Sequence, residues 1–301
     1  MNNPLVSVII PTYKRSESLP RAIRSVINQT YEPIEIIIVD DNDGNNEFRI
    51  STKSIVEKEF NTQKIIYLEH EKNKGLPAAR NTGIRISKGK YIAFLDDDDE
   101  WLPQKIEKQV ALFRKLPDDV GVVGCGWNLI DSVYHYREEK RPNHKGDLRK
   151  ILALNHFSPP SMVIIKKIYL EKVNGFDESY KSKEDIELYY RLSFYCKFDY
   201  VPEYLANYYY HPQSMSRNFK QKLEATEQFV KQHKNTLREN YLPWSQIHER
   251  KGELAASCGE LGKAVKAFIT AYRFNPGRIQ ILAKLLLSFL GAKRYVKIRK
   301  L

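Results

Sequence analysis

The chain has 301 residues, of which 42% are hydrophobic and 29% charged, and its net charge is +12. This length allows one large α/β domain with a smaller appendage, and the composition is that of a soluble globular protein. Its three cysteines lie far apart without paired spacing, which argues against a disulfide framework or a zinc site and favours a reducing, cytoplasmic setting.

No targeting segment is expected. The N-terminal sequence lacks a basic start and a small-residue cleavage site, so it does not resemble a secretory signal. The longest apolar tract, residues 279–292, is interrupted by Lys284 and falls short of the roughly 20 residues that span a bilayer. Residues 251–301 contain 11 Lys and Arg against 2 Glu, a net charge of 11 − 2 = +9, so most of the positive excess lies in this tail.

The first hundred residues alternate β-rich apolar runs with helical patterns. The expected strands are residues 5–10, 34–39, 64–68 and 90–95, and the expected helices are 16–28 and 75–87. Strands that alternate with helices predict β-α-β units and a mostly parallel sheet.

The pattern then becomes less regular. The expected elements are a helix at 103–116, a strand at 120–127, a mobile loop or edge hairpin at 132–146, a strand at 161–165, helices at 168–173 and 183–196, and a strand at 204–211. After residue 216 the pattern is helical, so we expect one domain over residues 1–215 and a helical extension over 216–301. Within the extension, Gly252, Ala264, Phe268, Ala271 and Pro276 resemble one tetratricopeptide-like helical pair, which predicts a helical hairpin packed on the main domain.

Acidic clusters follow two of the expected strands. Asp40 and Asp41 end the second strand, and four consecutive aspartates, Asp96 to Asp99, end the fourth. Open α/β sheets bind ligands beyond the carboxyl ends of their strands, so these clusters should share one edge. Neighbouring carboxylates repel by about 4 kcal/mol at an effective dielectric constant near 20. The run therefore predicts a bound cation, or else a solvated acidic turn.

Nucleotide-binding fingerprints of two common classes are absent. There is no Gly-x-Gly-x-x-Gly after the first strand and no Gly-x-x-x-x-Gly-Lys-Ser/Thr, which argues against a dinucleotide oxidoreductase and a P-loop enzyme. An acidic edge repels a diphosphate unless a divalent cation lies between them, and carboxylates with phosphate oxygens are the ligands that magnesium and manganese prefer.

Four motifs occur in order along the first hundred residues. They are Val6-Ser7-Val8-Ile9-Ile10-Pro11-Thr12-Tyr13, Ile38-Val39-Asp40-Asp41, Asn73-x-Gly75-x-x-x-Ala79-Arg80-Asn81-x-Gly83 and Gly89-x-Tyr91-Ile92-Ala93-Phe94-Leu95-Asp96-Asp97-Asp98-Asp99. Together they resemble the family 2 glycosyltransferases of the GT-A fold, over about residues 4–215. The resemblance implies a Rossmann-like, mostly parallel sheet flanked by helices. It also implies inverting transfer of a sugar from a nucleotide donor, usually UDP-linked, with bound Mn²⁺ or Mg²⁺.

The resemblance also implies roles for the strand-end residues. Pro11, Thr12 and Tyr13 correspond to the loop beneath the uracil and ribose, with Tyr13 as the stacking aromatic ring. Asp41 corresponds to the carboxylate that binds the base, with Asp40 as its structural neighbour. Arg80 corresponds to the basic residue near the base or the phosphates.

In the acidic run, Asp96 and Asp98 match the family's Asp-x-Asp, although four aspartates depart from its usual form. Asp96 and Asp97 are assigned to the nucleotide, and Asp96 and Asp98 to the metal. Which of the three ligates the metal stays open. His211 lies in a segment similar to one whose histidine approaches the phosphates, and we include it among the candidate metal ligands.

Later residues complete the expected site. Glu184 and Asp185 match a family Glu-Asp pair at a helix start, which makes Asp185 the expected general base. Pro160 and Ser161 match positions that shape the acceptor site. Trp101 is assigned either to the acceptor site or to packing at the start of a helix.

The basic tail has two interpretations. A basic amphipathic helix can lie on the anionic inner face of the cell membrane, where each Lys or Arg contributes about 1 kcal/mol to the binding free energy. It can instead be a solvated helix that packs its leucine face on the domain. Lipid-linked acceptors in surface polysaccharide synthesis, common in the family, favour the membrane.

Two alternatives to a hexosyltransferase remain. A catalytically silent module would bind the nucleotide sugar without transferring it. A basic nucleic-acid-binding protein is less consistent with the sequence, because the positive charge lies in the tail while the expected site is acidic.

Overall fold

The computed structural model describes residues 3–61, 65–131, 136–151, 157–210, 218–239 and 241–299. Two compact units divide the chain, and each is described by itself. The first comprises residues 1–148, 156–179 and 188–212, and the second comprises residues 149–155, 180–187 and 213–301.

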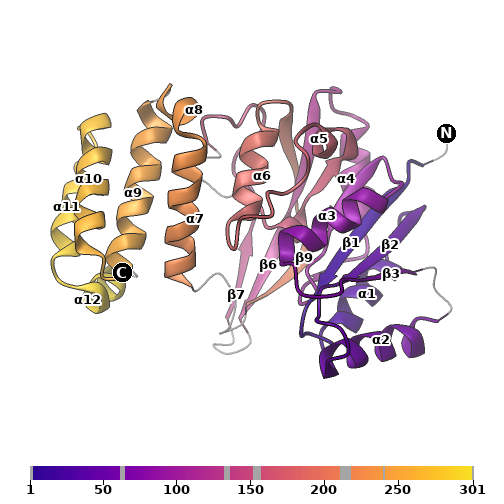
Figure 1. The fold of residues 1–301 in the computed structure, drawn as a ribbon. Coiled ribbons are helices and arrows are strands. Elements are labelled where there is room, and N and C mark those ends of the chain that lie inside the picture. The colour runs from indigo at the N-terminus through magenta and orange to yellow at the C-terminus, as the bar shows by residue number, and fades with distance from the viewer. Residues whose placement is uncertain are drawn as a thin grey trace. The chain divides into compact units, whose positions relative to one another are not determined.

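A nine-stranded sheet forms the centre of the first unit, within the described residues (Figure 1). Its strands are β1 (Val6–Thr12), β2 (Ile34–Asp40), β3 (Ile65–Glu69), β4 (Tyr91–Phe94), β5 (Glu100–Trp101), β6 (Val120–Asp131), β7 (Tyr136–Lys140), β8 (Ile164–Lys166) and β9 (Lys197–Tyr210). The strand order is β3-β2-β1-β4-β8-β6-β9-β5, and β7 pairs with β6 outside this path.

The two halves of the sheet differ in direction. Strands β3, β2, β1 and β4 are parallel neighbours, as predicted. In the other half β8 runs antiparallel to both β4 and β6, β5 runs antiparallel to β9, and β6 and β9 are parallel. The sheet is therefore mixed, because the parallel arrangement predicted from the first hundred residues does not extend beyond β4.

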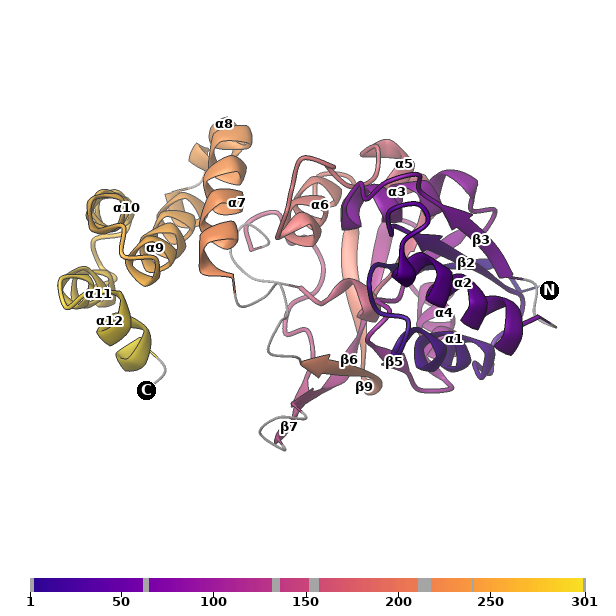
Figure 2. The ribbon, with the colours of Figure 1, turned by 60° about the horizontal axis from the view of Figure 1, so that its bottom comes forward.

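Helices flank the sheet on both faces (Figure 2). They are α1 (Leu19–Ile27), α2 (Glu47–Glu59), α3 (Leu76–Ile86), α4 (Lys105–Phe113) and α5 (Lys167–Lys172), together with the 3₁₀ turn η1 (Pro160–Met162). Helices α1 and α3 contact the parallel half, whereas α4 and α5 contact strands of the other half. Alternate residues of β1 point to opposite faces. Val8 packs in one core cluster with Ile23 of α1 and Val110 of α4. On the opposite face, a Cβ atom on Gly83 of α3 would lie 2.4 Å from the Ile9 side chain, so glycine allows α3 to approach β1 closely.

Two local results complement the sequence analysis. Helix α2 was not predicted, although the Asn46 side chain caps its first turn by accepting a hydrogen bond from the Arg49 backbone N–H at 2.8 Å. For residues 132–146, the edge hairpin is confirmed over the described part, because β7 pairs antiparallel with β6.

Helices form the second unit. They are α7 (Phe219–Gln232), α8 (Lys234–Arg238), α9 (Tyr241–Ser257), α10 (Leu261–Phe274), α11 (Gln280–Ser288) and α12 (Ala292–Arg299). The predicted hairpin is α9 with α10. A Cβ atom on Gly252 would lie 2.7 Å from the Phe268 ring, and the Ser245 hydroxyl donates to the Ala271 carbonyl at 2.7 Å. Helix α6 (Glu184–Leu192) begins in this unit and ends in the first.

No helix in the described part of the chain has the length and apolar composition that crossing a membrane requires.

Candidate active site

The carboxyl ends of the parallel strands form one acidic edge of the first unit. Thr12 at the end of β1 is paired in register with Asp40 at the end of β2. On the other side of β1, Ile9 is paired with Phe94, two residues before Asp96. The prediction that the two acidic clusters share an edge is therefore confirmed.

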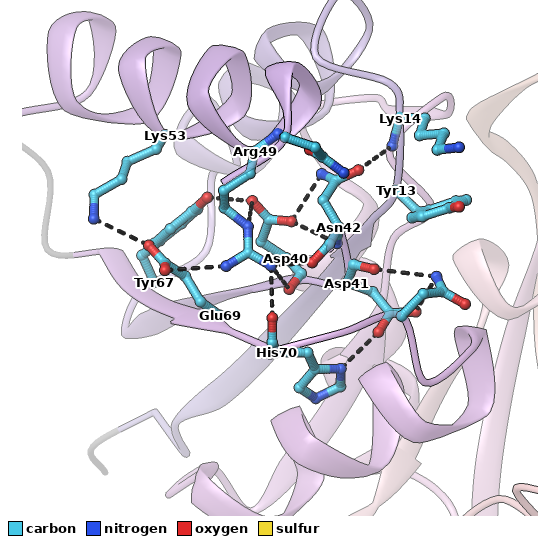
Figure 3. A network of polar contacts seen from close by, with 12 residues as sticks. Tyr13, Lys14, Asp40, Asp41, Asn42, Arg49, Lys53, Tyr67, Glu69 and His70 are labelled. Carbon is cyan, nitrogen blue, oxygen red and sulfur yellow. Dashed lines mark hydrogen bonds and ion pairs between the residues drawn. The ribbon is translucent and has the colours of Figure 1, made fainter. Parts of the chain in front are cut away.

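Asp40 is held by the protein itself (Figure 3). Its carboxylate is fully buried, accepts hydrogen bonds from the Asn42 backbone N–H at 2.9 Å and from the Tyr67 hydroxyl, and lies 3.1 Å from Arg49 Nε. Burial first, and then the contact with Asp40, raises the pKa of Tyr67, so this hydroxyl remains a donor at neutral pH. Asp40 is thus a structural anchor at the end of β2.

Arg49 connects Asp40 to the neighbouring strand end (Figure 3). Its Nη1 lies 3.0 Å from Glu69 Oε2, and its Nη2 donates to the backbone carbonyls of Asn42 and His70, the latter at 2.7 Å. The guanidinium is almost fully buried. One arginine therefore fixes the segments that follow β2 and β3.

Asp41 is also surrounded by partners from the protein. His70 Nδ1 lies 2.6 Å from Oδ1, which also accepts from the Lys74 backbone N–H at 2.8 Å. Oδ2 accepts from the Gly75 backbone N–H at 2.8 Å and from Asn73 Nδ2 at 2.9 Å. A carboxylate offers about four acceptor positions. A hydrogen bond from Asp41 to a base would replace one of these four donors, and the role of Asp41 in base binding stays a prediction.

The loop after β1 lies against this cluster (Figure 3). The Lys14 backbone N–H donates to Asn42 Oδ1 at 2.9 Å, and the Lys14 ammonium lies 5.0 Å from the centre of the Tyr13 ring. Pro11 and Thr12 are buried within β1, whereas the Tyr13 ring is exposed. An exposed aromatic ring on a fixed backbone is a suitable surface on which a base can stack.

Asp96 forms an ion pair with Arg80 of helix α3. Arg80 Nη2 donates to Asp96 Oδ1 at 2.7 Å, and the Arg80 guanidinium lies 5.2 Å from the Phe176 ring centre. Arg80 is 1% exposed. The Asp96 backbone N–H donates to the Ser161 hydroxyl at 3.1 Å, so η1 supports the start of the acidic run.

Asp97 and Asp98 share a second arginine. Arg15 Nη1 lies 3.4 Å from Asp97 Oδ1 and also contacts Asp98 Oδ2. Asp97 Oδ2 accepts from the Tyr13 backbone N–H at 3.3 Å. Burial, followed by the charge of Asp98, raises the pKa of Asp97 to about 7, while Arg15 acts in the opposite direction.

The end of the run is structural. Asp99 is 1% exposed, accepts from the Tyr209 backbone N–H at 3.2 Å, and has a pKa raised mainly by burial. Trp101 is buried in the core and its indole N–H donates to the Ser161 carbonyl at 2.6 Å. Of the two interpretations of Trp101, the structure supports packing.

Three predicted residues remain, Glu184, Asp185 and His211. Glu184 and Asp185 are buried at the start of α6, in the second unit. Just before them, Lys183 is half-buried and its ammonium donates to the Thr226 hydroxyl at 2.7 Å. His211 lies outside the described residues.

Sequence reasoning missed Arg15, Arg49 and His70. Arg15 could have been found from its position two residues after Tyr13, in the loop opposite the acidic run. Arg49 and His70 have no such signal, because their partners are backbone carbonyls and carboxylates that only the fold brings together.

A family model described as "Glycosyl transferase family 2" matches residues 7–173. The chain therefore belongs to glycosyltransferase family 2. It is 36% identical over 194 residues to the uncharacterized glycosyltransferase RP339 of Rickettsia prowazekii, an alignment that covers 63% of this chain and 58% of the relative. It is also 36% identical over 116 residues to WfgD of Escherichia coli, a UDP-Glc:alpha-D-GlcNAc-diphosphoundecaprenol beta-1,3-glucosyltransferase. That alignment covers 38% of this chain and 43% of WfgD.

Solved structures share the fold. TarS residues 1–349 of S. aureus in complex with UDP-GlcNAc match with a TM-score of 0.69 at 17% identity, covering 96% of this chain and 89% of TarS 1–349. The mannosyltransferase PcManGT of Pyrobaculum calidifontis in complex with GDP-Man and Mn²⁺ matches with a TM-score of 0.58 at 18% identity, covering 90% and 76%. The predicted GT-A fold with C-terminal helices is confirmed.

Replacing Arg49 with Met should leave the buried Asp40 carboxylate without its ion pair. We expect the free energy of unfolding to fall by about 3–5 kcal/mol, because an uncompensated charge remains inside the protein. Urea denaturation measures this change. The control is Arg24→Met on α1, which removes an exposed ion pair with Glu59 and should cost about 1 kcal/mol or less. Equal losses in the two variants would show that the Asp40 network does not support the edge.

Lys183 predicts a pH-dependent stability. Burial lowers its pKa to about 7, and Arg250 and Lys222 act in the same direction. An unfolded lysine titrates near about 10.4, so between these values the unfolded state binds a proton that the folded state does not. This contribution to stability is present above about pH 10.4 and is lost as the pH falls towards about 7.

Lys183→Met should therefore be more stable than the wild type by roughly 1–3 kcal/mol near neutral pH, and the difference should shrink towards about pH 10.5. Urea denaturation at the two pH values checks this expectation, with the exposed Lys234→Met as control. A difference that is the same at both pH values would contradict it.

Proposed function

We propose that the chain is an inverting, metal-dependent hexosyltransferase. It would move a sugar from a UDP-linked donor to a hydroxyl of a glycan or lipid-linked glycan in surface polysaccharide synthesis. The observation that carries the proposal is the adjacent carboxylates of Asp97, which is buried, and Asp98, whose side chain is 14% exposed, beside the exposed ring of Tyr13 in a family 2 chain. Together these carboxylates require a cation. Residues 1–215 would form the catalytic domain, and 216–301 the helical extension.

The relatives support this substrate class. The structural neighbours bind UDP-GlcNAc in one case and GDP-Man with Mn²⁺ in the other, and WfgD is a glucosyltransferase for a GlcNAc-diphosphoundecaprenol acceptor. The chain spans only 58% of RP339 and 43% of WfgD, so donor and acceptor are proposed here by class.

The donor set fits a divalent cation that arrives with a diphosphate. In the described part of the chain, no three His, Cys, Asp or Glu side chains gather as a metal-binding cluster. Magnesium is commonly held by one or two carboxylates and completed by substrate phosphates and water. Asp98 and Asp96 would supply the carboxylates. Asp98 already has a positive charge beside it, because Arg15 Nη1 contacts its Oδ2. His211 is proposed as a third ligand from the sequence alone.

The chemistry assigned to this chain is a single displacement. Asp185, with Glu184 beside it, would accept the proton of the acceptor hydroxyl as the acceptor oxygen bonds to the anomeric carbon. The bond from that carbon to the phosphate oxygen breaks, and its electron pair leaves with the diphosphate, inverting the configuration. A bound metal would offset the negative charge on the leaving group.

Donor binding would fall to the strand-end loops. The Tyr13 ring would stack on the uracil, with Pro11 and Thr12 beneath the nucleoside and Asp41 and Arg80 close to the base or phosphates. Asp96 and Asp97 would bind on the nucleotide side of the metal. Pro160 and Ser161, at the start of η1, would shape the acceptor side.

Replacing Asp185 with Asn should remove the base and leave the donor site intact. We expect the turnover number to fall by about 10²–10⁴ while the dissociation constant for UDP stays unchanged. Transfer to a GlcNAc-diphosphoundecaprenol acceptor from a panel of UDP-sugars with Mn²⁺ measures the first, and calorimetry the second. Glu171→Gln, at an exposed ion pair with Lys167, is the control.

Three outcomes would change these assignments. Full transfer by Asp185→Asn would show that the base is another residue. Binding of UDP-sugars by the wild type without transfer or hydrolysis would favour the silent binding module. An absence of both binding and turnover would contradict the proposed function.

We also propose that the second unit contacts an anionic membrane. Leu286 of α11 and Phe289 just after it are 69% and 58% exposed, and Lys293, Arg294 and Lys297 of α12 are exposed as well. Apolar side chains flanked by cations are the composition that binds anionic lipid.

Part of the basic tail belongs to the core of the second unit. Tyr295 of α12 is 2% exposed and belongs to the core of the second unit, as does Ile281 of α11. Deleting residues 290–301 would therefore disturb packing as well as membrane contact. Substitutions at Leu286 and Phe289 avoid that problem.

The double substitution Leu286→Ser and Phe289→Ser should weaken binding to phosphatidylglycerol vesicles by roughly tenfold or more, since each buried methylene contributes about 0.8 kcal/mol. Cosedimentation measures the bound fraction, and phosphatidylcholine vesicles should bind neither protein. The control Ile50→Ser removes a residue that is 62% exposed in the first unit. Equal cosedimentation of the wild type and the double variant would contradict the membrane contact.

A further inference from the structure

Arg15 lies on the solvent side of the two carboxylates that need a cation most. Its side chain is 39% exposed, whereas those of Asp97 and Asp98 are 7% and 14% exposed. It belongs to the loop that follows Tyr13, and its Nη1 contacts both carboxylates. The guanidinium is thus a positive cap over a largely buried negative pair.

This negative pair is costly without a counter-ion. Two adjacent carboxylates in a partly buried place repel by several kcal/mol at an effective dielectric constant near 20. Arg15 Nη1 lies 3.4 Å from Asp97 Oδ1 and also contacts Asp98 Oδ2. Its positive charge therefore already occupies Asp98, one of the two carboxylates assigned to the metal.

The other arginines at the run are held differently. Arg80 is 1% exposed and packs beside the Phe94 and Phe176 rings, so removing it from Asp96 would open the core. Arg21 donates to the Asp98 backbone carbonyl, and its guanidinium lies 3.8 Å from the Tyr209 ring centre. Arg15, by contrast, has a partly exposed side chain outside the core, so it can leave the carboxylates without opening the core.

We propose that Arg15 is an exchangeable counter-ion of Asp97 and Asp98, displaced when a divalent cation binds and then free to pair with the diphosphate of the donor. This inference rests on the proposed function. The charges of the cation and of the diphosphate largely cancel, so the net negative charge of the site stays nearly the same. Arg15 pairs with the carboxylates before the exchange and with the diphosphate after it. The planar guanidinium suits carboxylates and phosphates equally.

The exchange has a thermodynamic consequence. A metal ion that enters alone must displace Arg15 and leave it without a partner, so it binds weakly. A metal ion that enters with a nucleotide diphosphate supplies Arg15 with a new partner. Metal and nucleotide therefore bind cooperatively, and Arg15 carries part of the coupling free energy.

The test measures Mn²⁺ binding to Arg15→Met and to the wild type by electron paramagnetic resonance, with and without UDP. Methionine keeps the length of the side chain and adds no hard ligand. All proteins are measured in the same buffer at the same pH. Arg21→Met is the matched control, because it removes a neighbouring positive charge that contacts only a backbone atom of the run. Circular dichroism verifies that each variant is folded.

We expect Arg15→Met to bind Mn²⁺ alone roughly tenfold more tightly than the wild type, about 1.4 kcal/mol. The factor by which UDP strengthens Mn²⁺ binding should fall in this variant, and Arg21→Met should behave as the wild type does.

Three results would overturn the inference. If Mn²⁺ alone binds equally to the wild type and Arg15→Met, while UDP still strengthens its binding, Arg15 is no competitor and the proposed function stands. If both arginine variants tighten Mn²⁺ binding equally, the effect is one of general charge. If no protein binds Mn²⁺ even with UDP, the inference fails together with the metal dependence in the proposed function.

Discussion

The structure depends on how buried carboxylates are neutralised at one edge of a parallel sheet. Apolar strands bring Asp40 and Asp96 to this edge and continue into segments in which Asp41, Asp97 and Asp99 are buried. Burying a charge without a partner costs several kcal/mol, so the fold has to supply positive charge and hydrogen-bond donors there. Most of the polar contacts around the candidate site follow from this requirement.

The two acidic clusters meet the requirement in different ways. Asp40 and Asp41 receive partners from α2, from β3 and from the segments that follow β2 and β3, and most of these partners are buried side chains or backbone N–H groups. Asp97 and Asp98 depend on Arg15, a side chain from a partly exposed loop. The first cluster is suited to holding loops in place, and the second to accepting a ligand. Two clusters suited to these two different tasks therefore lie at one sheet edge.

Much of this edge could be predicted from the sequence, because the signals are local. An apolar run that ends in aspartates marks both a buried strand and the point where it reaches the edge, and the β-α-β alternation gives the parallel direction of β1 to β4. The mixed second half could not be predicted, since a three-residue strand such as β8 has no periodicity and its direction depends on distant pairing. Helix α2 was missed because only a few of its residues, such as Val56, are buried. The hydrogen bonds that fill the acceptor positions of Asp41 could not be predicted either, because their donors lie about thirty residues away in sequence.

The central claim is that the acidic edge binds a nucleotide diphosphate only through a divalent cation. Calorimetric titration of the wild-type protein with UDP, once with Mn²⁺ and once with a chelator, tests it most directly. The account predicts that Mn²⁺ strengthens UDP binding by about tenfold or more, since carboxylates and phosphates repel each other without it. Equal UDP affinity in the presence of the chelator would contradict the account.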